Sequence, residues 1–201
     1  MKLPTRIFLT GVPGSRWSLI CQYLEQIPGM NTSDRQPHRE YVHHAYTGHK
    51  GAYFGRGMEL EARLDATYLD AAWSEPGGTK VVKSHDWAYV LHDIKQRFPQ
   101  DWIMLVYRPD LESYAWWHEV GGFQIKYPRY DAYKNSITML AEITQQNRCI
   151  LEFAFKHHVA WHYYTAEWIE NTFGYRIEPE RVWPDILVTL ITSPSRTAYQ
   201  G

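Results

Sequence analysis

The sequence predicts an α/β fold with three layers (α/β/α) around a central, mainly parallel sheet. The segment KVVK at 80–83 is expected to be a short strand, and the apolar runs at 7–9 and 102–107 are typical of buried strands. The last run, WIMLVY, suits a central strand, because parallel strands covered on both faces are continuously apolar. Segments with apolar residues at helical spacing separate the runs. Strands that alternate with helices favour a parallel sheet with helices on both faces.

The composition fits a single domain over residues 1–201. The chain is 44% hydrophobic and 21% charged, with a formal net charge of −1. Nucleic-acid-binding domains carry a clear basic excess, so this balance argues against nucleic-acid partners. No run approaches the roughly 18 apolar residues of a membrane span, and the N-terminus lacks a signal-peptide pattern. Cys21 and Cys149 lie far apart outside any CxxC motif, so we expect buried thiols in a cytoplasmic protein without membrane partners.

The first strand leads through a glycine-rich turn, 11–18, into a helix. A strand–turn–helix unit of this kind leaves backbone N–H groups at the positive end of the helix, where a phosphate can bind. The helix is expected because apolar residues recur at helical spacing from Leu19 to Ile27. We interpret residues 31–57 as a long loop of the kind that often forms part of a binding site.

The later elements continue the alternation. We expect helices over 58–73 and 87–98, a further helix after Asp110 that ends at Gly121 and Gly122, a long helical region over 131–172, a last strand at 186–191, and a flexible tail over 192–201.

Three of the expected strands end in polar, reactive residues. The turn 11–18 follows the first strand, Lys83-Ser84-His85 closes the second, and Arg108 follows the third. In parallel α/β sheets the ligand site lies at the carboxyl ends of the strands. We therefore expect these three strand ends to share one site.

Each side chain at these ends has a chemical use and a structural alternative. His85 can act as a general base near neutral pH, and Lys83 points to the same side of its strand and supplies positive charge. Arg108 suits a bidentate phosphate contact, and Ser113 adds a hydroxyl one helical turn later. The alternative for His85 is a surface or a hydrogen-bonded histidine, and the alternative for Arg108 is a salt bridge at the strand end.

The turn departs from the loop of nucleotide kinases. In the GxxxxGK[ST] pattern, Gly11 and Ser18 fit, but Arg16 stands at the second glycine and Trp17 at the lysine. An ATP site would therefore lack its phosphate lysine, and no acidic residue ends a strand where it would hold Mg²⁺. Taken alone, the turn is equally typical of an ordinary strand–helix connection.

The segments GVPGSRWSLI, VVKSH and LVYRPDLESYAWW, in this order, resemble the motifs of sulfotransferases that use 3′-phosphoadenosine 5′-phosphosulfate (PAPS). The resemblance covers roughly the first 120 residues. It implies a P-loop-like fold, PAPS as the sulfuryl donor, adenosine 3′,5′-bisphosphate (PAP) as the product and no metal. It also implies His85 as the catalytic base, Arg108 and Ser113 at the 3′-phosphate, and a loop around the 5′-phosphosulfate made of Gly11, Pro13, Gly14, Ser15, Arg16, Trp17 and Ser18.

The sequence departs from the family pattern in three places. The family loop reads P-[KR]-S-G-T-[TS], whereas this loop has Gly14 at the basic position and Arg16 two places later. We infer that Arg16, with Lys83, contacts the departing phosphate. The spacing from Arg108 to Ser113 is shorter than usual, and the C-terminal glycine-rich basic motif of the longer enzymes is absent. The chain thus resembles small, trimmed relatives from bacteria and their viruses.

The expected reaction is an in-line sulfuryl transfer to a hydroxyl or amine of a small-molecule or glycan acceptor. His85 would take the acceptor proton, while Arg16, Lys83 and the loop N–H groups would stabilise charge on the leaving phosphate. We expect an aromatic acceptor pocket, although the same side chains also suit a hydrophobic core. Its candidates are Tyr53, Phe54, Trp116, Trp117, Phe123 and Tyr127.

Three other hypotheses are weighed against this one. A P-loop phosphotransferase would require ATP and Mg²⁺. A non-catalytic nucleotide- or sugar-binding module would bind its ligand without transfer. His158 and His162 stand four residues apart on an expected helix, but no acidic or cysteine partner has matching spacing, so the sequence does not favour a zinc site.

Overall fold

The protein is an α/β structure built on a mixed five-stranded sheet with the order β2-β1-β3-β5-β4. The computed structural model describes residues 2–35, 63–124, 134–178 and 183–192. Three of the expected acceptor residues, Tyr53, Phe54 and Tyr127, lie outside these ranges, as do most of the expected loop 31–57 and nearly all of the tail 192–201.

The first three strands form the parallel part of the sheet. They are β1 (Arg6–Gly11), β2 (Lys80–Lys83) and β3 (Trp102–Tyr107). Leu9 is in register with Lys83, and Gly11 is in register with Val106. The carboxyl ends of these strands therefore meet at one edge of the sheet, as the sequence predicts.

Of the two strands nearer the C-terminus, the last one runs against this direction and the other runs along it. β5 (Leu187–Ile191) pairs antiparallel with β3, with Leu187 opposite Tyr107, and β4 (His162–Tyr163) pairs antiparallel with β5. The sheet is thus mixed. Because β5 is antiparallel to β3, the residues just before β5 lie at the edge where β1, β2 and β3 end.

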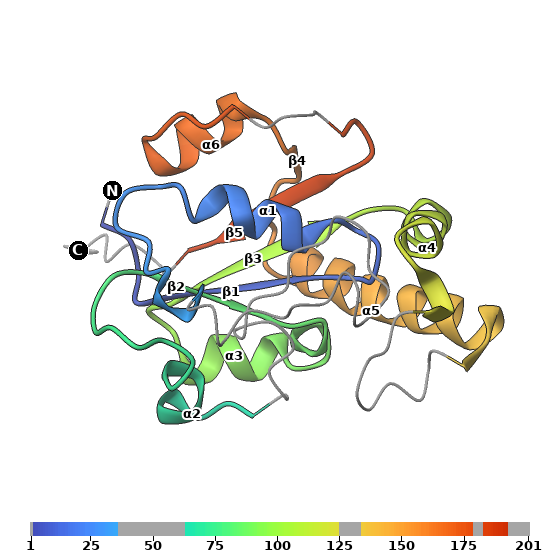
Figure 1. The fold of residues 1–201 in the computed structure, drawn as a ribbon, viewed down its shortest axis with the longest axis horizontal. Helices are drawn as coiled ribbons and strands as arrows, with labels where there is room; N and C mark the ends of the chain where they lie inside the picture. Colours follow the sequence, from blue (N-terminus) through green and yellow to red (C-terminus); the bar gives the residue numbers. More distant parts are fainter. Residues whose placement is uncertain (1, 36–62, 125–133, 179–182, 193–201) are drawn as a thin grey trace, which may run out of the picture.

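Helices lie on both sides of the sheet (Figure 1). Helices α1 (Trp17–Leu24) and α6 (Ala166–Phe173) are on one side, and α3 (Leu91–Arg97) and α5 (Ser136–Lys156) are on the other. Helix α4 (Asp110–Glu119) stands at the end of the sheet. The shorter elements are α2 (Ala66–Asp70) and the 3-10 helices Ser33–Arg35, Asp86–Tyr89 and Gly122–Gln124.

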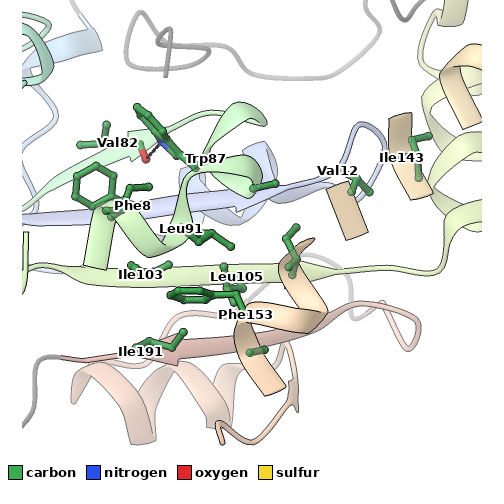
Figure 2. Packing of buried hydrophobic residues seen from close by; sticks show 14 of the residues in the cluster. Phe8, Val12, Val82, Trp87, Leu91, Ile103, Leu105, Ile143, Phe153 and Ile191 are labelled. Atoms are coloured by element: carbon green, nitrogen blue, oxygen red, sulfur yellow. Dashed lines mark hydrogen bonds between the residues drawn. The ribbon is translucent and has the colours of Figure 1, made fainter. Parts of the chain in front are cut away.

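The alternation of side chains along the strands produces two hydrophobic clusters, one on each face of the sheet. Leu9 and Met104 belong to the cluster that contains α1 residues, and neither is exposed. Phe8, Ile103 and Phe153 belong to the cluster on the α3 and α5 side (Figure 2). Burial of each large apolar side chain contributes about 1.5–3 kcal/mol, so these clusters fix the face that each strand presents.

One expectation about the helices is wrong. Residues 131–172 do not form one helical region, since α5 ends at Lys156 and the chain then forms β4 before α6 begins. His158 adopts a left-handed backbone (φ 51°), and the Thr165 hydroxyl starts α6 by accepting the N–H of Trp168 at 3.1 Å. His158 and His162 therefore do not share a helix face.

Among the residues described, no three histidine, cysteine or acidic side chains stand close enough together to hold a metal ion. None of the helices in the described ranges has the length and apolar character needed to span a bilayer.

Candidate functional site

The turn after β1 is built on a close approach to α4. Gly14 has a positive φ of 82°, and a Cβ added there would lie 1.8 Å from the carbonyl oxygen of Ser113. The turn is closed by the N–H of Ser15, which donates to the Val12 carbonyl at 3.0 Å, and Pro13 is buried within it. Only glycine fits at position 14, because any side chain would collide with the backbone of α4.

Arg16 and the next two residues connect this turn to α1. Arg16 is the N-cap residue and adopts the left-handed region with a φ of 64°. Trp17 and Ser18 are the first helical residues, so their backbone N–H groups belong to the positive end of the helix. The turn therefore presents N–H groups where the sequence predicts a phosphate.

His85 is hydrogen-bonded to the first residue of this turn. Its Nδ1 lies 2.8 Å from the carbonyl oxygen of Gly11. A carbonyl can only accept, so Nδ1 carries the proton and the lone pair belongs to Nε2. The ring of Trp17 packs edge-to-face on the imidazole with ring centroids 4.7 Å apart. Burial lowers the pKa of His85 to about 4, although the bond to Gly11 partly opposes this, so the imidazole is neutral at pH 7.

Lys83 lies beneath α1 and is fully buried. Its Nζ is 3.6 Å from Oε1 of Glu25, which follows the last residue of α1 and also accepts from Cys21 Sγ at 3.1 Å. Eight helical residues span about 12 Å, so Glu25 is remote from the turn at the other end of α1. Lys83 therefore pairs with a carboxylate inside the protein instead of pointing at the turn.

Arg108 is the second side chain that bonds to the turn. Its Nη1 donates to the carbonyl oxygen of Gly14 at 3.0 Å, and its Nε donates to Oδ2 of Asp185 at 2.6 Å. Ser113 is fully buried, and its hydroxyl donates to the Arg108 carbonyl at 3.2 Å. The Asn147 side chain donates to the same carbonyl at 2.9 Å. Ser113 thus holds the end of β3 in place, with its proton committed to that bond.

Arg16 is stacked between two tryptophans. Its guanidinium carbon lies 3.2 Å from the ring centroid of Trp116 and 3.2 Å from that of Trp183. Stacking of this type stabilises a cation by about 0.5–2 kcal/mol, depending on how far the pair is shielded from water. Arg16 is therefore held at the aromatic pair.

Three of the expected acceptor residues lie within the described ranges, and one of them, Phe123, is 41% exposed. Trp117 is 2% exposed and belongs to the core, and Phe123 packs on it with ring centroids 5.0 Å apart. Trp116 contacts Arg16, as described above. A groove of about 480 Å³ lies instead between the first turn of α4 and α5, and the sequence did not single it out. Its lining includes Tyr107, Pro109, Leu111, Thr144 and Leu151.

Sequence reasoning missed Trp183 and Asp185. They belong to a turn of residues 183–186, closed by the N–H of Ile186, which donates to the Trp183 carbonyl at 3.2 Å. Pro184 suits the second position of such a turn, so a turn was readable from the sequence. Its place at the site depends on the antiparallel direction of β5, which the sequence pattern does not specify.

Comparison of the chain with protein-family models, with curated proteins and with solved structures gave no match. The chemistry of the site is therefore inferred from its motifs and its geometry.

The turn and the two arginines suit an anionic ligand. Arg16 and Arg108 both lie at the edge where the parallel strands end, next to the N-terminus of α1. The Ser15 hydroxyl is fully buried and has no hydrogen-bond partner among the described residues. A buried hydroxyl without a partner costs about 1–3 kcal/mol, and an anionic oxygen next to the turn would satisfy it. Lys83 is paired with Glu25 instead.

Proposed function

We propose that the chain is a PAPS-dependent sulfotransferase that acts on a hydroxyl or amine of a small-molecule or glycan acceptor. One observation carries the proposal. Side chains from the ends of two different strands, His85 and Arg108, both contact the turn that follows a third, at the carbonyls of Gly11 and Gly14. The three motifs on which the family resemblance rests are therefore neighbours in space.

The proposed binding roles follow from these contacts. The N–H groups of the turn and of the first residues of α1, with Ser15 and Arg16, hold the 5′-phosphosulfate. Arg108 binds the 3′-phosphate, for which its planar guanidinium is suited. Ser113 fixes the backbone of Arg108 and acts as a positioning residue. This assignment presupposes the P-loop-like, three-layer architecture of the family.

Lys83 receives a different role from the one that its motif implies. Its ion pair with Glu25 is fully buried and remote from the turn. This arrangement supports a structural role, in which Lys83 fixes α1 on the sheet. Arg16 then supplies the side-chain charge at the leaving phosphate, once it has left the tryptophan pair.

PAPS supplies the sulfuryl group, and its phosphate is the leaving group. As the acceptor oxygen or nitrogen bonds to sulfur, the sulfur–oxygen bond to the phosphate breaks and its electron pair stays on that phosphate. The acceptor proton passes to Nε2 of His85, since Nδ1 already carries a proton on the Gly11 side. A pKa of about 4 keeps the imidazole unprotonated at neutral pH, which is the state in which it can accept a proton.

We also propose a cytoplasmic location. Cys21 is buried and Cys149 is half-buried, and no disulfide joins these two described residues. Cysteines that stay reduced are typical of the cytoplasm, where disulfides are rare.

The first test is calorimetric titration with PAP, with ATP plus Mg²⁺ as the comparison. The proposal expects PAP to bind without metal and ATP to bind at least tenfold more weakly. A preference for ATP and Mg²⁺ would support a phosphotransferase, and no binding of PAP would overturn the proposal.

The second test separates catalysis from binding. Asn can keep the donated bond to Gly11 but offers no basic nitrogen, so His85→Asn should bind PAP normally. Its transfer from labelled PAPS to a panel of acceptors should fall by about 10²–10⁴-fold. His162→Asn, at an exposed histidine of β4, is the matched control. PAP binding without transfer to any acceptor would indicate a non-catalytic nucleotide-binding module.

A further inference from the structure

One short turn holds both arginines of the site. Within residues 183–186, Asp185 pairs with Arg108 at 2.6 Å, and the ring of Trp183 stacks on Arg16 at 3.2 Å. Arg108 and Arg16 are the two side chains assigned above to the two phosphate groups. A single segment therefore engages both ends of the anion-binding site.

The fold fixes this turn at the site. β5 begins at Leu187, directly opposite Tyr107, the last residue of β3. Ile186 is 1% exposed and belongs to the core, so it anchors the turn from below. A last strand parallel to β3 would have placed the same turn at the opposite edge of the sheet, away from Arg108.

The contact between Asp185 and Arg108 is a replaceable one. Only one carboxylate oxygen meets only one guanidinium nitrogen, Nε. The Asp185 side chain is 28% exposed, so it can turn to water without burying an unpaired charge. Among the described residues, no other carboxylate is within salt-bridge distance of Arg108. A phosphate offers several oxygens to the planar fork of an arginine and is the better match.

We propose that Asp185 is a built-in competitor for the anion site: its carboxylate occupies Arg108 until a phosphate of the ligand displaces it. This inference rests on the proposed function, because it takes the ligand to be a bisphosphate nucleotide. Asp185 and Trp183 belong to the same hydrogen-bonded turn. Displacement of the carboxylate therefore also loosens the stack on Arg16.

The competition lowers affinity, since the ligand has to break the ion pair before it binds. A partly exposed ion pair is worth at most about 1 kcal/mol, or roughly fivefold in affinity. Because the ion pair between Asp185 and Arg108 re-forms when the ligand leaves, it also favours release of the product PAP. The carboxylate thus discriminates against weakly charged anions, which gain too little at Arg108 to displace it.

The test is calorimetric titration of PAP into the parent chain and three variants. Asp185→Asn keeps the size of the side chain but removes its charge, and PAP should bind it about fivefold more tightly. Asp185→Glu keeps the charge and should bind like the parent. Glu178→Gln removes an exposed carboxylate that pairs with Arg176 on the surface, and it should leave PAP affinity unchanged.

The outcomes separate the inference from the proposed function. If the parent binds PAP and Asp185→Asn binds equally or more weakly, Asp185 orients Arg108 and the competition is overturned, while the proposed function stands. If Asp185→Asn and Glu178→Gln tighten binding alike, the effect is one of general charge and the competition is again overturned. If none of the proteins binds PAP, both proposals fall. Thermal melting of each variant checks that it folds.

Discussion

Two cations at the carboxyl ends of β2 and β3, the strands on either side of β1, are held in opposite ways. Lys83, at the end of β2, is fully buried and pairs with Glu25, which is 3% exposed. Arg108, just after β3, is 10% exposed and pairs with Asp185, which is 28% exposed. The motifs that contain the two cations had predicted phosphate contacts for both.

The difference in burial separates structure from binding. A buried pair has paid the desolvation cost of two charges, so each partner depends on the other. A partly exposed pair depends little on its partner, because water can replace it. The Lys83 pair is therefore a fixed part of the core, whereas the Arg108 pair is able to exchange its carboxylate for a ligand.

The largest expected effect is on the buried pair. Lys83→Met leaves the Glu25 carboxylate buried without its cation, so we expect the free energy of unfolding to fall by roughly 3–5 kcal/mol in urea titrations. Asp185→Asn, the matched change at the exposed pair, should lower it by less than about 1 kcal/mol. Equal losses for the two variants would contradict the comparison. The double variant Lys83→Met/Glu25→Leu should recover part of the loss, because it removes both buried charges.

The burial of His85 predicts that the stability of the protein depends on pH. The pKa of His85 is about 4 in the folded protein and about 6.5 in the unfolded chain, because burial disfavours the charged imidazole. Between pH 6.5 and pH 4 this histidine is protonated in the unfolded chain but not in the folded protein. Proton binding therefore favours the unfolded chain, and the free energy of unfolding falls as the pH drops over this range. The difference of about 2.5 pKa units corresponds to about 3 kcal/mol at pH 4.

Urea titrations at pH 7, 5.5 and 4.5 measure this effect. His85→Asn has no proton to bind at this position, so its stability should decline less steeply than that of the parent over the same range. Parallel profiles of the parent and the variant would show that His85 titrates normally and is accessible to water.

Local patterns were sufficient for much of the fold. The runs at 7–9 and 102–107 are buried strands because they are apolar over their whole length, which strands covered on both faces require. The strand at 80–83 is also buried, although it begins and ends with a lysine. The long helical region expected over 131–172 is interrupted after Lys156 for a tertiary reason. His162 and Tyr163 find strand partners in β5, and this pairing overrides the helical spacing of the surrounding aromatics.

The site was only partly predictable, because its pairings depend on non-local contacts. The sequence predicts that the turn lies close to His85 and Arg108, because parallel strands end at the same edge of a sheet, and the structure shows both contacts. The burial of Lys83 does not follow from its motif, since it depends on Glu25 at the far end of α1. Asp185 was missed because its place at Arg108 depends on the direction of β5.

The central claim is that Arg108 and the turn after β1 form one bisphosphate site. The most direct test is calorimetric titration of PAP into Arg108→Ala, with Arg176→Ala as the control, since Arg176 is an exposed arginine that also pairs with carboxylates. The account predicts that Arg108→Ala binds PAP about 10- to 100-fold more weakly, the value of one or two charge-assisted hydrogen bonds, while Arg176→Ala binds like the parent. Unchanged affinity in a folded Arg108→Ala protein, or equal losses in the two variants, would contradict it.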